Sequence, residues 1–262
     1  MDIKELNVNV AQKTTQNHPW EYARAKVVMD LLKKHSKTSP QPKYVLDVGC
    51  GDIFFLNQYC TKNPNDIPVA VDTAFNEEII ASLSNQYQGL NVLFFDHTDK
   101  VDLSGKHADI VFLMDVIEHI EDDVEFIQDL IQKPFIDNNT IFLITVPAFN
   151  KLYCNHDKWL GHYRRYNQKM LREHLKKAGL EILSGGYFFT TLLLPRMFQK
   201  WVESAKEKEI EVTGIGGWTG GKFISKAYEL FLLCDYFFFK IFRIVGIKFP
   251  GLSTYAVCKR QS

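Results

Sequence analysis

The chain alternates short apolar runs with amphipathic stretches over most of its length. Five runs are apolar throughout, without polar–apolar alternation, which is typical of strands buried on both faces of a parallel sheet. These runs are residues 44–49, 68–72, 91–96, 108–115 and 140–147. Two further strands are predicted at 180–189 and 253–260. Together with the intervening helices they predict an α/β fold with an open, doubly wound, Rossmann-like sheet.

Capping residues predict where several of the helices begin. Asn76, Asp122 and Asn167 each precede an apolar stripe of helical period and are suited to accept hydrogen bonds from the first turn. The third of these helices is expected to stop at Gly179, since glycine favours helix ends. A further helix is predicted over residues 14–36, ahead of the first strand and over the ligand site.

The region between the last two predicted strands has helical and aromatic character. We expect residues 192–250 to form a helical insertion that covers the site, within a single domain of residues 1–262. Residues 228–249 combine a polar side with an apolar side rich in Phe. Such a helix can pack on the sheet, close an apolar pocket or lie in a membrane surface. We favour packing or a pocket, and peripheral membrane contact through residues 228–249 stays open.

Charge and cysteine content limit which kinds of partner and which cellular compartment we expect. Lys and Arg total 31, as do Asp and Glu, so the net charge is zero and we expect no nucleic-acid partner. The five cysteines form no CxxC pair, and the first twenty residues lack the apolar core of a signal peptide. We therefore expect free thiols and a cytoplasmic protein. The oligomeric state stays open.

Acidic residues gather where predicted strands end, and parallel strands end at the same edge of a sheet. A glycine turn follows the first strand and leads into a helix near Ile53. The carboxylate that ends the second strand is suited to both hydroxyls of a ribose, and the one that ends the third to an adenine amino group. The four aspartates are Asp47, Asp72, Asp96 and Asp115.

The chemistry of this edge favours a cationic nucleoside over a dinucleotide. A complete dinucleotide fingerprint would need a third glycine where Phe54 stands, and Asp47 would repel a pyrophosphate. S-adenosylmethionine has adenine, ribose, a sulfonium and an amino group, and it carries no phosphate. It therefore suits the carboxylates better.

The motifs DVGCGD, PVAVD, FFD and MDVIEHIED resemble the class I S-adenosylmethionine-dependent methyltransferases over residues 20–190. The similarity is closest to the small-molecule branch with ubiquinone-pathway-type O-methyltransferases. It implies a seven-stranded sheet whose last strand, 253–260, is antiparallel. One departure is Ile53, where the family usually has glycine, and this affects the expected cofactor affinity.

The resemblance also implies which residues bind the cofactor. The glycine turn and its aspartate would contact the methionine part, Asp72 the ribose, and Asp96 with the backbone of His97 the adenine. Asp115 and Val116 would border the methyl donor, and Arg24 would approach the carboxylate of the methionine part. The full set is Arg24, Asp47, Gly49, Cys50, Gly51, Asp72, Asp96, His97, Asp115 and Val116.

Histidines near the fourth and fifth strands are candidates for removing a proton from a hydroxyl acceptor. The catalytic candidates are His119, His156, Asp157 and His162, and the candidates for gripping an anionic acceptor are Tyr163, Arg164 and Arg165. Each of these residues also has a purely structural interpretation. We expect no metal, because the spacing of His156, Asp157 and His162 is not an established ligand pattern.

The expected function is methyl transfer from S-adenosylmethionine to a small-molecule acceptor. O-methylation of a hydrophobic or anionic acceptor is the first expectation. The alternative is a catalytically inactive S-adenosylmethionine-binding regulatory protein, favoured by Ile53 and by the lack of one compelling base. A nicotinamide-dependent oxidoreductase is the third hypothesis and requires the incomplete fingerprint at Phe54 to be tolerated.

Overall fold

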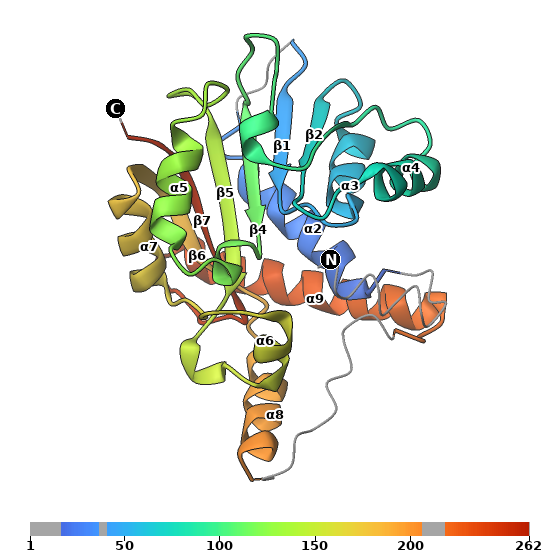
Figure 1. Ribbon diagram of the computed structural model, residues 1–262. Helices are drawn as coiled ribbons and strands as arrows, with labels where there is room; N and C mark the ends of the chain where they lie inside the picture. The colour runs from blue at the N-terminus through green and yellow to red at the C-terminus, as the bar shows by residue number, and fades with distance from the viewer. Residues whose placement is uncertain (1–16, 37–40, 206–217, 262) are drawn as a thin grey trace.

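The computed structural model describes residues 17–36, 41–205 and 218–261. Seven strands form one sheet in the order β3-β2-β1-β4-β5-β7-β6 (Figure 1). The strand β7 runs antiparallel to both of its neighbours, β5 and β6, while the pairs among β1 to β5 are parallel. The predicted fold class, with seven strands and the last one antiparallel, is confirmed.

Each predicted strand is present within a few residues of its expected bounds. The strands are β1 (Tyr44–Val48), β2 (Ile67–Val71), β3 (Leu93–Phe95), β4 (Ile110–Met114), β5 (Ile141–Pro147), β6 (Leu180–Phe188) and β7 (Ser253–Arg260). The α-helices are α2 (Pro19–Leu32), α3 (Phe54–Lys62), α4 (Glu77–Gln86), α5 (Asp123–Ile131), α6 (Asn155–Leu160), α7 (Gln168–Lys177), α8 (Leu193–Ala205) and α9 (Lys222–Ile244). Short 3-10 turns are η1 (Thr98–Lys100), η2 (Ile117–His119) and η3 (Asn150–Leu152).

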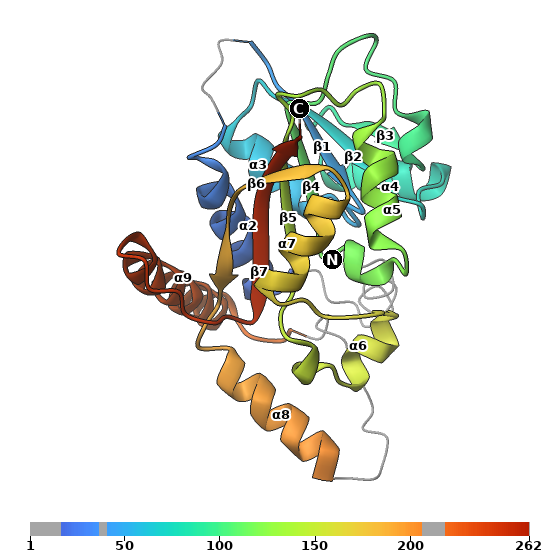
Figure 2. The ribbon, with the colours of Figure 1, turned by 90° about the vertical axis from the view of Figure 1, so that its left-hand side faces the viewer.

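The sheet is buried on both faces, as its apolar strands require. Along β4, Ile110 and Phe112 belong to the core that packs against α2 and α3, while Val111 and Leu113 belong to the core beneath α5 and α7. Figure 2 shows α2 and α3 on one side of the sheet and α5 and α7 on the other. This sandwich leaves the carboxyl ends of the parallel strands as the place for a ligand site.

Two of the three predicted caps form. Asn76 Oδ1 accepts from the backbone N–H of Ile79 at 2.9 Å, and Asn167 Oδ1 accepts from that of Met170 at 2.8 Å. Gly179 follows the end of α7 with φ +88°, as predicted. Asp122 occupies the N-cap position of α5, as predicted. Its side chain makes no capping hydrogen bond, so the predicted contact was wrong.

Ile53 takes the left-handed conformation that glycine adopts easily. Its φ is 51°, which costs an L-residue about 1–2 kcal/mol. The side chain is buried in the core with α2 and α3, and burial of an Ile offsets this cost. The departure from glycine is therefore accommodated inside the protein core.

The insertion before β7 contains α8 and α9, and its residues 206–217 lie outside the described part of the chain. The helix α9 contacts α2, but only Glu229, Leu232, Asp235 and Tyr236 of α9 are buried. Phe223, Phe231, Phe237 and Phe238 are exposed, and of residues 228–249 only Tyr228 lines the cavity at the carboxyl ends of the strands. The expectation that the Phe-rich side packs on the sheet or closes a pocket was therefore wrong for these Phe side chains. Within the described residues no helix is long and apolar enough to cross a bilayer.

The glycine turn after β1 gives a test of this packing. Gly49 has φ +70°, and a Cβ there would lie 2.7 Å from Val116 Cγ2; Gly89 has φ +88° with no atom that close. Both Gly49→Ala and Gly89→Ala incur the left-handed cost of about 1–2 kcal/mol. Gly49→Ala is expected to lose about 2 kcal/mol more in the free energy of unfolding, because it overpacks.

Chemical denaturation of the two variants measures this difference. Adding Val116→Ala to Gly49→Ala removes the two methyl groups that the new Cβ meets and is expected to recover most of the extra loss. Equal destabilisation of the two single variants would contradict the close approach of the turn to Val116.

Candidate active site

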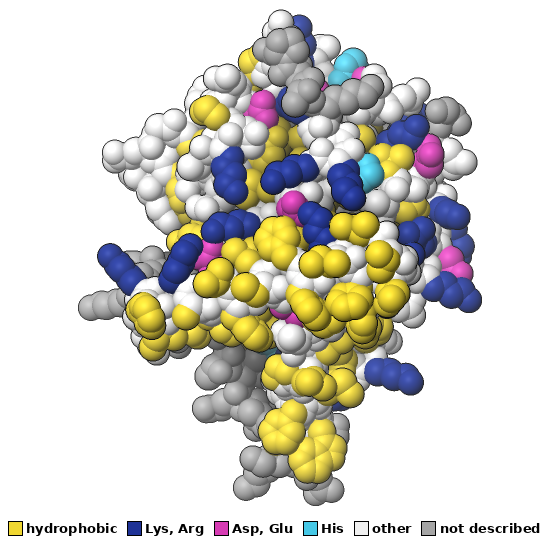
Figure 3. All heavy atoms as spheres, turned by 180° about the vertical axis from the view of Figure 1, so that it is seen from behind, with side chains coloured by type: hydrophobic (Ala, Val, Ile, Leu, Met, Phe, Trp, Pro, Cys, Tyr) yellow, Lys and Arg dark blue, Asp and Glu magenta, His cyan; other side chains and the backbone are white. Residues whose placement is uncertain are grey.

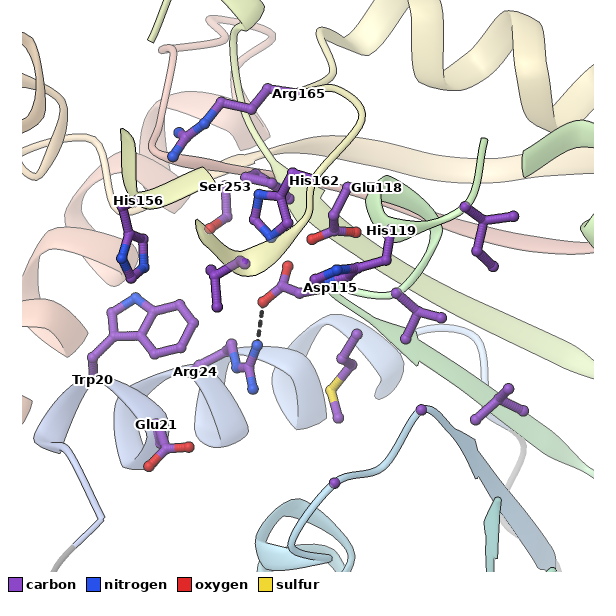
Figure 4. A pocket seen from close by; sticks show the side chains of 18 of the residues that line it. Trp20, Glu21, Arg24, Asp115, Glu118, His119, His156, His162, Arg165 and Ser253 are labelled. Atoms are coloured by element: carbon purple, nitrogen blue, oxygen red, sulfur yellow. Dashed lines mark hydrogen bonds and ion pairs between the residues drawn. The ribbon is translucent and has the colours of Figure 1, made fainter. Parts of the chain in front are cut away.

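A cavity of about 970 Å³ lies at the carboxyl ends of the strands. The glycine turn and the ends of β2 and β4 form its inner part, α2 closes one side, and the segment from α6 to α7 together with α8 forms the outer part. Figure 4 shows side chains from these separate elements directed into the same space. The volume is at the upper end for small-molecule sites, enough for two ligands.

Backbone amides hold Asp72 at the end of β2. Its Oδ2 accepts from the N–H of Gly51 at 2.9 Å, and its Oδ1 accepts from the N–H of Ala74 at 3.0 Å. The carboxylate is half-buried and lines the cavity beside the glycine turn. It is thus fixed in orientation and can still accept hydroxyl donors from a ligand.

Asp47 is a buried carboxylate without a hydrogen-bond partner among the described residues. Its side chain lies under the glycine turn, and neither of its oxygens is bonded. Burial raises the pKa of Asp47 to about 7, opposed by the charge of Arg24 and reinforced by Asp72 and Asp52. A cationic group near the turn would stabilise the ionised form.

Arg24 connects α2 to the end of β4. Its guanidinium forms an ion pair with Asp115 and lies over the ring of Trp20 at 4.5 Å from the ring centre (Figure 4). Asp115 has φ +58°, and its Oδ1 also accepts from Thr145 Oγ1 at 3.4 Å. The helix α2 contributes Trp20, Glu21 and Arg24 to the lining, and Arg24 is directed at Asp115. Residues 14–16 of the predicted leading helix lie outside the described part of the chain.

The remaining cofactor candidates divide into two groups. Gly49, Gly51, Val116 and His97 line the cavity. The carboxylate of Asp96 is outside the lining and pairs with Lys100 at 2.6 Å; this hydrogen bond holds the pKa of Asp96 below its usual value. Cys50 is also outside the lining, and burial raises the pKa of its thiol well above the usual value, which makes it unreactive.

Asp157, on α6, organises the outer part of the cavity. Its Oδ1 accepts from Arg165 Nε at 2.7 Å and from His162 Nδ1 at 2.9 Å, while its Oδ2 accepts from the N–H of Cys154 at 2.9 Å and from Arg196 at 3.2 Å. Burial raises the pKa of Asp157, but the bonds from His162 and Arg165 outweigh it and hold that pKa well below its usual range. Asp157 is therefore ionised and orients its partners.

The other acceptor-side candidates lie in different surroundings. His156 lines the cavity and stacks on Trp159; burial and the charge of Arg196 lower its pKa to about 4. Arg165 lines the cavity, whereas Arg164 bonds to Glu121 O and Asp123 outside the lining. Tyr163 is 54% exposed and outside the lining too. Of the three residues predicted to grip the acceptor, Tyr163, Arg164 and Arg165, only Arg165 therefore lines the cavity.

Sequence reasoning missed Glu118, which lies in the VIEHIED motif itself. Glu118 is fully buried and lines the cavity, and both of its carboxylate oxygens lack a hydrogen-bond partner among the described residues. Burial and the neighbouring Asp115 raise the pKa of Glu118 well above its usual value. Arg196 was also not predicted from the sequence. It lies on α8, lines the cavity and pairs with Asp157, which is 39 residues earlier in the chain.

Glu118, His119 and His162 converge on one point (Figure 4). The two imidazole rings meet edge to face with centres 4.5 Å apart. One ligand atom from each of the three residues lies within 4.8 Å of the others, so this trio could hold a divalent cation. The set weighed from the sequence, His156 with Asp157 and His162, is less suited, because Asp157 already accepts from four groups.

The raised pKa of Asp47 predicts a pH-dependent stability. Below pH 4 the group is protonated in both the folded and unfolded states, and above pH 7 it is ionised in both. The folded state therefore loses stability as pH rises from about 4 to 7, by about 4 kcal/mol for the rise in pKa from 3.8 to about 7. Asp47→Asn removes this loss.

Denaturant titrations between pH 4 and pH 8 compare Asp47→Asn with the wild type and with Asp122→Asn at an exposed position. The variant at position 47 is expected to gain stability relative to the wild type as pH rises. The Asp122→Asn curve should run parallel to the wild type. Parallel curves for all three proteins would show that Asp47 is not held in a desolvated place.

The sequence matches a family described as a methyltransferase domain over residues 20–184, which is more than half of the chain. No curated protein sequence matches the chain.

Solved structures share the fold at low identity. An S-adenosylmethionine-dependent methyltransferase from Clostridium acetobutylicum is similar with a TM-score of 0.53 and 12% identity, over 95% of this chain and 94% of that one. The cyclase SpnF has a TM-score of 0.54 and 17% identity, over 92% and 82%. LepI in complex with SAM has a TM-score of 0.47 and 16% identity over 62% of this chain, and the match spans only 43% of LepI.

The amide-held carboxylate of Asp72 and the carboxylate of Asp115 line the cavity, and together they fit an adenosyl cofactor with a cationic end. Asp47 is buried behind the lining and has no hydrogen-bond partner among the described residues, so it can act on the cofactor only through its charge. The family match and the strand order agree with this site. The chain belongs to the class I S-adenosylmethionine-dependent methyltransferases.

Proposed function

We propose that the protein methylates a hydroxyl oxygen of a small, largely apolar acceptor. The acceptor lies in the outer part of the cavity, beside His162. The observation that carries this proposal is His162, which lines the same cavity as Asp72 and Asp115 and is held by a hydrogen bond to the buried carboxylate of Asp157. The more specific resemblance to ubiquinone-pathway-type enzymes stays a prediction.

The inner part of the cavity holds the cofactor. Asp72 accepts the ribose hydroxyls, and the backbone N–H groups that bind its oxygens keep it in place. Asp115 faces the cationic methionine end, and the buried Asp47 adds negative charge behind the glycine turn, with Arg24 balancing part of the charge of both. When bound, the cofactor supplies a methyl group on a positively charged sulfur, ready for in-line displacement.

His162 removes the proton from the acceptor hydroxyl. Donation from Nδ1 to the ionised Asp157 sets the tautomer and leaves Nε2 as the nitrogen that accepts the proton. The imidazolium that forms is stabilised by the same carboxylate. His156 is a weaker base than an ordinary imidazole, because burial and the charge of Arg196 lower its pKa to about 4.

The outer lining sets the character of the acceptor. Leu160, Leu192, Pro195 and Leu252 supply apolar surface there. Arg165 and Arg196 share the single carboxylate of Asp157, which balances one of their two positive charges. An apolar acceptor that carries a hydroxyl suits this lining better than a multiply charged one. The residues contributed by α8 support the interpretation of 192–250 as an insertion that closes the acceptor side.

Replacement of His162 by Asn tests the proposal. Asn can still donate to Asp157 from the place of Nδ1, but it offers nothing in the place of Nε2. We expect kcat to fall by roughly 10²-fold or more, with affinity for S-adenosylmethionine within about twofold of the wild type. The matched control, His156→Asn, is expected to lose less than about tenfold, because its imidazole takes no proton.

The measurement is formation of S-adenosylhomocysteine with a panel of phenols and long-chain hydroxy compounds. Turnover by the wild type that survives in His162→Asn would show that proton removal depends on another group. Tight cofactor binding by the wild type without product from any acceptor would favour the non-catalytic regulatory alternative.

A further inference from the structure

The helix α9 is amphipathic with its polar side turned inward. Glu229 pairs with Lys26 of α2, and Lys240 pairs with Asp30 of the same helix. Asp235 accepts from the backbone N–H groups of Thr190 and Thr191, at 3.0 and 2.9 Å. A helix on the surface of a water-soluble protein has the opposite arrangement, with charged groups outward.

The apolar side of α9 is left facing outward. Phe231, Phe237, Phe238, Ile241 and Ile244 are exposed along it, and Phe223, near its start, is 87% exposed. The ring contacts of Phe231, Phe237 and Phe238 that the structure shows are with neighbours on α9 itself. Exposed apolar patches of this extent mark a binding surface for a protein or a membrane.

The helix α8 extends the same surface. Leu194, Met197, Phe198 and Trp201 are exposed at intervals of three and four residues, which places them on one side of the helix. Figure 3 shows the apolar side chains as one band over α9 that continues toward α8, with Lys and Arg along one edge. We call this surface, formed by the exposed apolar residues of α8 and α9, the apolar face.

The exposed ionised side chains of α9 are all lysines. Both acidic side chains of α9, Glu229 and Asp235, are buried. Lys222 and Lys226 at the start of α9 are exposed, as is Lys248 after its end. A surface that combines aromatic side chains with cations and shows no exposed carboxylate on α9 is complementary to anionic lipid headgroups.

We propose that the apolar face docks on the surface of an anionic phospholipid bilayer. Its Phe and Trp side chains enter the boundary between headgroups and acyl chains, and its lysines contact lipid phosphates. A second copy of the chain is a poorer partner, because the same face would bring cations against cations. The proposed contact stays at the bilayer surface, since no described helix has the length and apolarity to cross the bilayer.

Docking places the acceptor space next to the lipid. Leu192, Pro195, Arg196 and Gln199, at the start of α8 and just before it, line the cavity, while the exposed stripe of α8 belongs to the apolar face. A membrane-resident amphiphile with a hydroxyl would therefore pass one helix to reach His162. This last step rests on the proposed function, whereas docking itself does not.

Vesicle flotation with the full chain tests the docking. The probes are vesicles of phosphatidylcholine alone and vesicles with about one third phosphatidylglycerol. The variants are Phe238→Glu with Ile241→Glu on α9 and Phe198→Glu with Trp201→Glu on α8. Tyr163→Glu, an exposed aromatic outside the apolar face, is the matched control. All variants are first checked for an unchanged melting temperature and unchanged S-adenosylmethionine affinity.

We expect the wild type and Tyr163→Glu to float with the anionic vesicles and each double variant to bind at least roughly tenfold more weakly. Lys222→Gln with Lys248→Gln is expected to weaken binding to anionic vesicles by roughly tenfold and to leave binding to neutral vesicles unchanged. No flotation of the folded wild type, or flotation insensitive to both double variants, would overturn the proposal. A dimer in sedimentation that Phe238→Glu with Ile241→Glu dissociates, without vesicle binding, would assign the face to a second copy. Since no turnover is measured, a failure of methyl transfer leaves this result intact.

Discussion

The convergence of carboxylates at one edge of the sheet is the constraint on which the site depends. Asp47 is the penultimate residue of β1, Asp72 and Asp115 directly follow β2 and β4, and Glu118 comes three residues later, so four carboxyl groups lie close together in partly or fully buried places. Arg24 of α2 neutralises part of the negative charge by its ion pair with Asp115. Two buried carboxylates, Asp47 and Glu118, still have raised pKa values. A cationic ligand relieves this repulsion, which connects the fold to an S-adenosylmethionine site.

The strands and the inner site could be predicted because they depend on local pattern. Apolar runs mark buried strands, and parallel strands bring their last residues to one edge, so Asp72 and Asp115 were found from sequence. The outer site depends on tertiary pairing. Whether Arg164 or Arg165 faced the cavity was decided by Asp157 and Asp123, and neighbouring residues in a loop give no signal of that choice.

Helix period shows that α9 has two sides, but not which of them faces inward. The inward side was decided by partners distant in sequence: Lys26 and Asp30 on α2, and the backbone of Thr190 and Thr191. A rule that places Phe inside therefore failed for this helix. The same lack of local signal hid Arg196, which reaches Asp157 only because α8 leaves the sheet beside α6.

Calorimetric titration with S-adenosylmethionine most directly tests the claim that the carboxylate edge is the cofactor site. We predict that the wild type binds, that Asp72→Ala loses roughly tenfold or more in affinity, and that Asp96→Ala, whose carboxylate pairs with Lys100 in the wild type, changes within roughly threefold. NAD, as the control ligand, should give no heat of binding. Binding of NAD, or S-adenosylmethionine affinity that is unchanged in Asp72→Ala, would contradict the account.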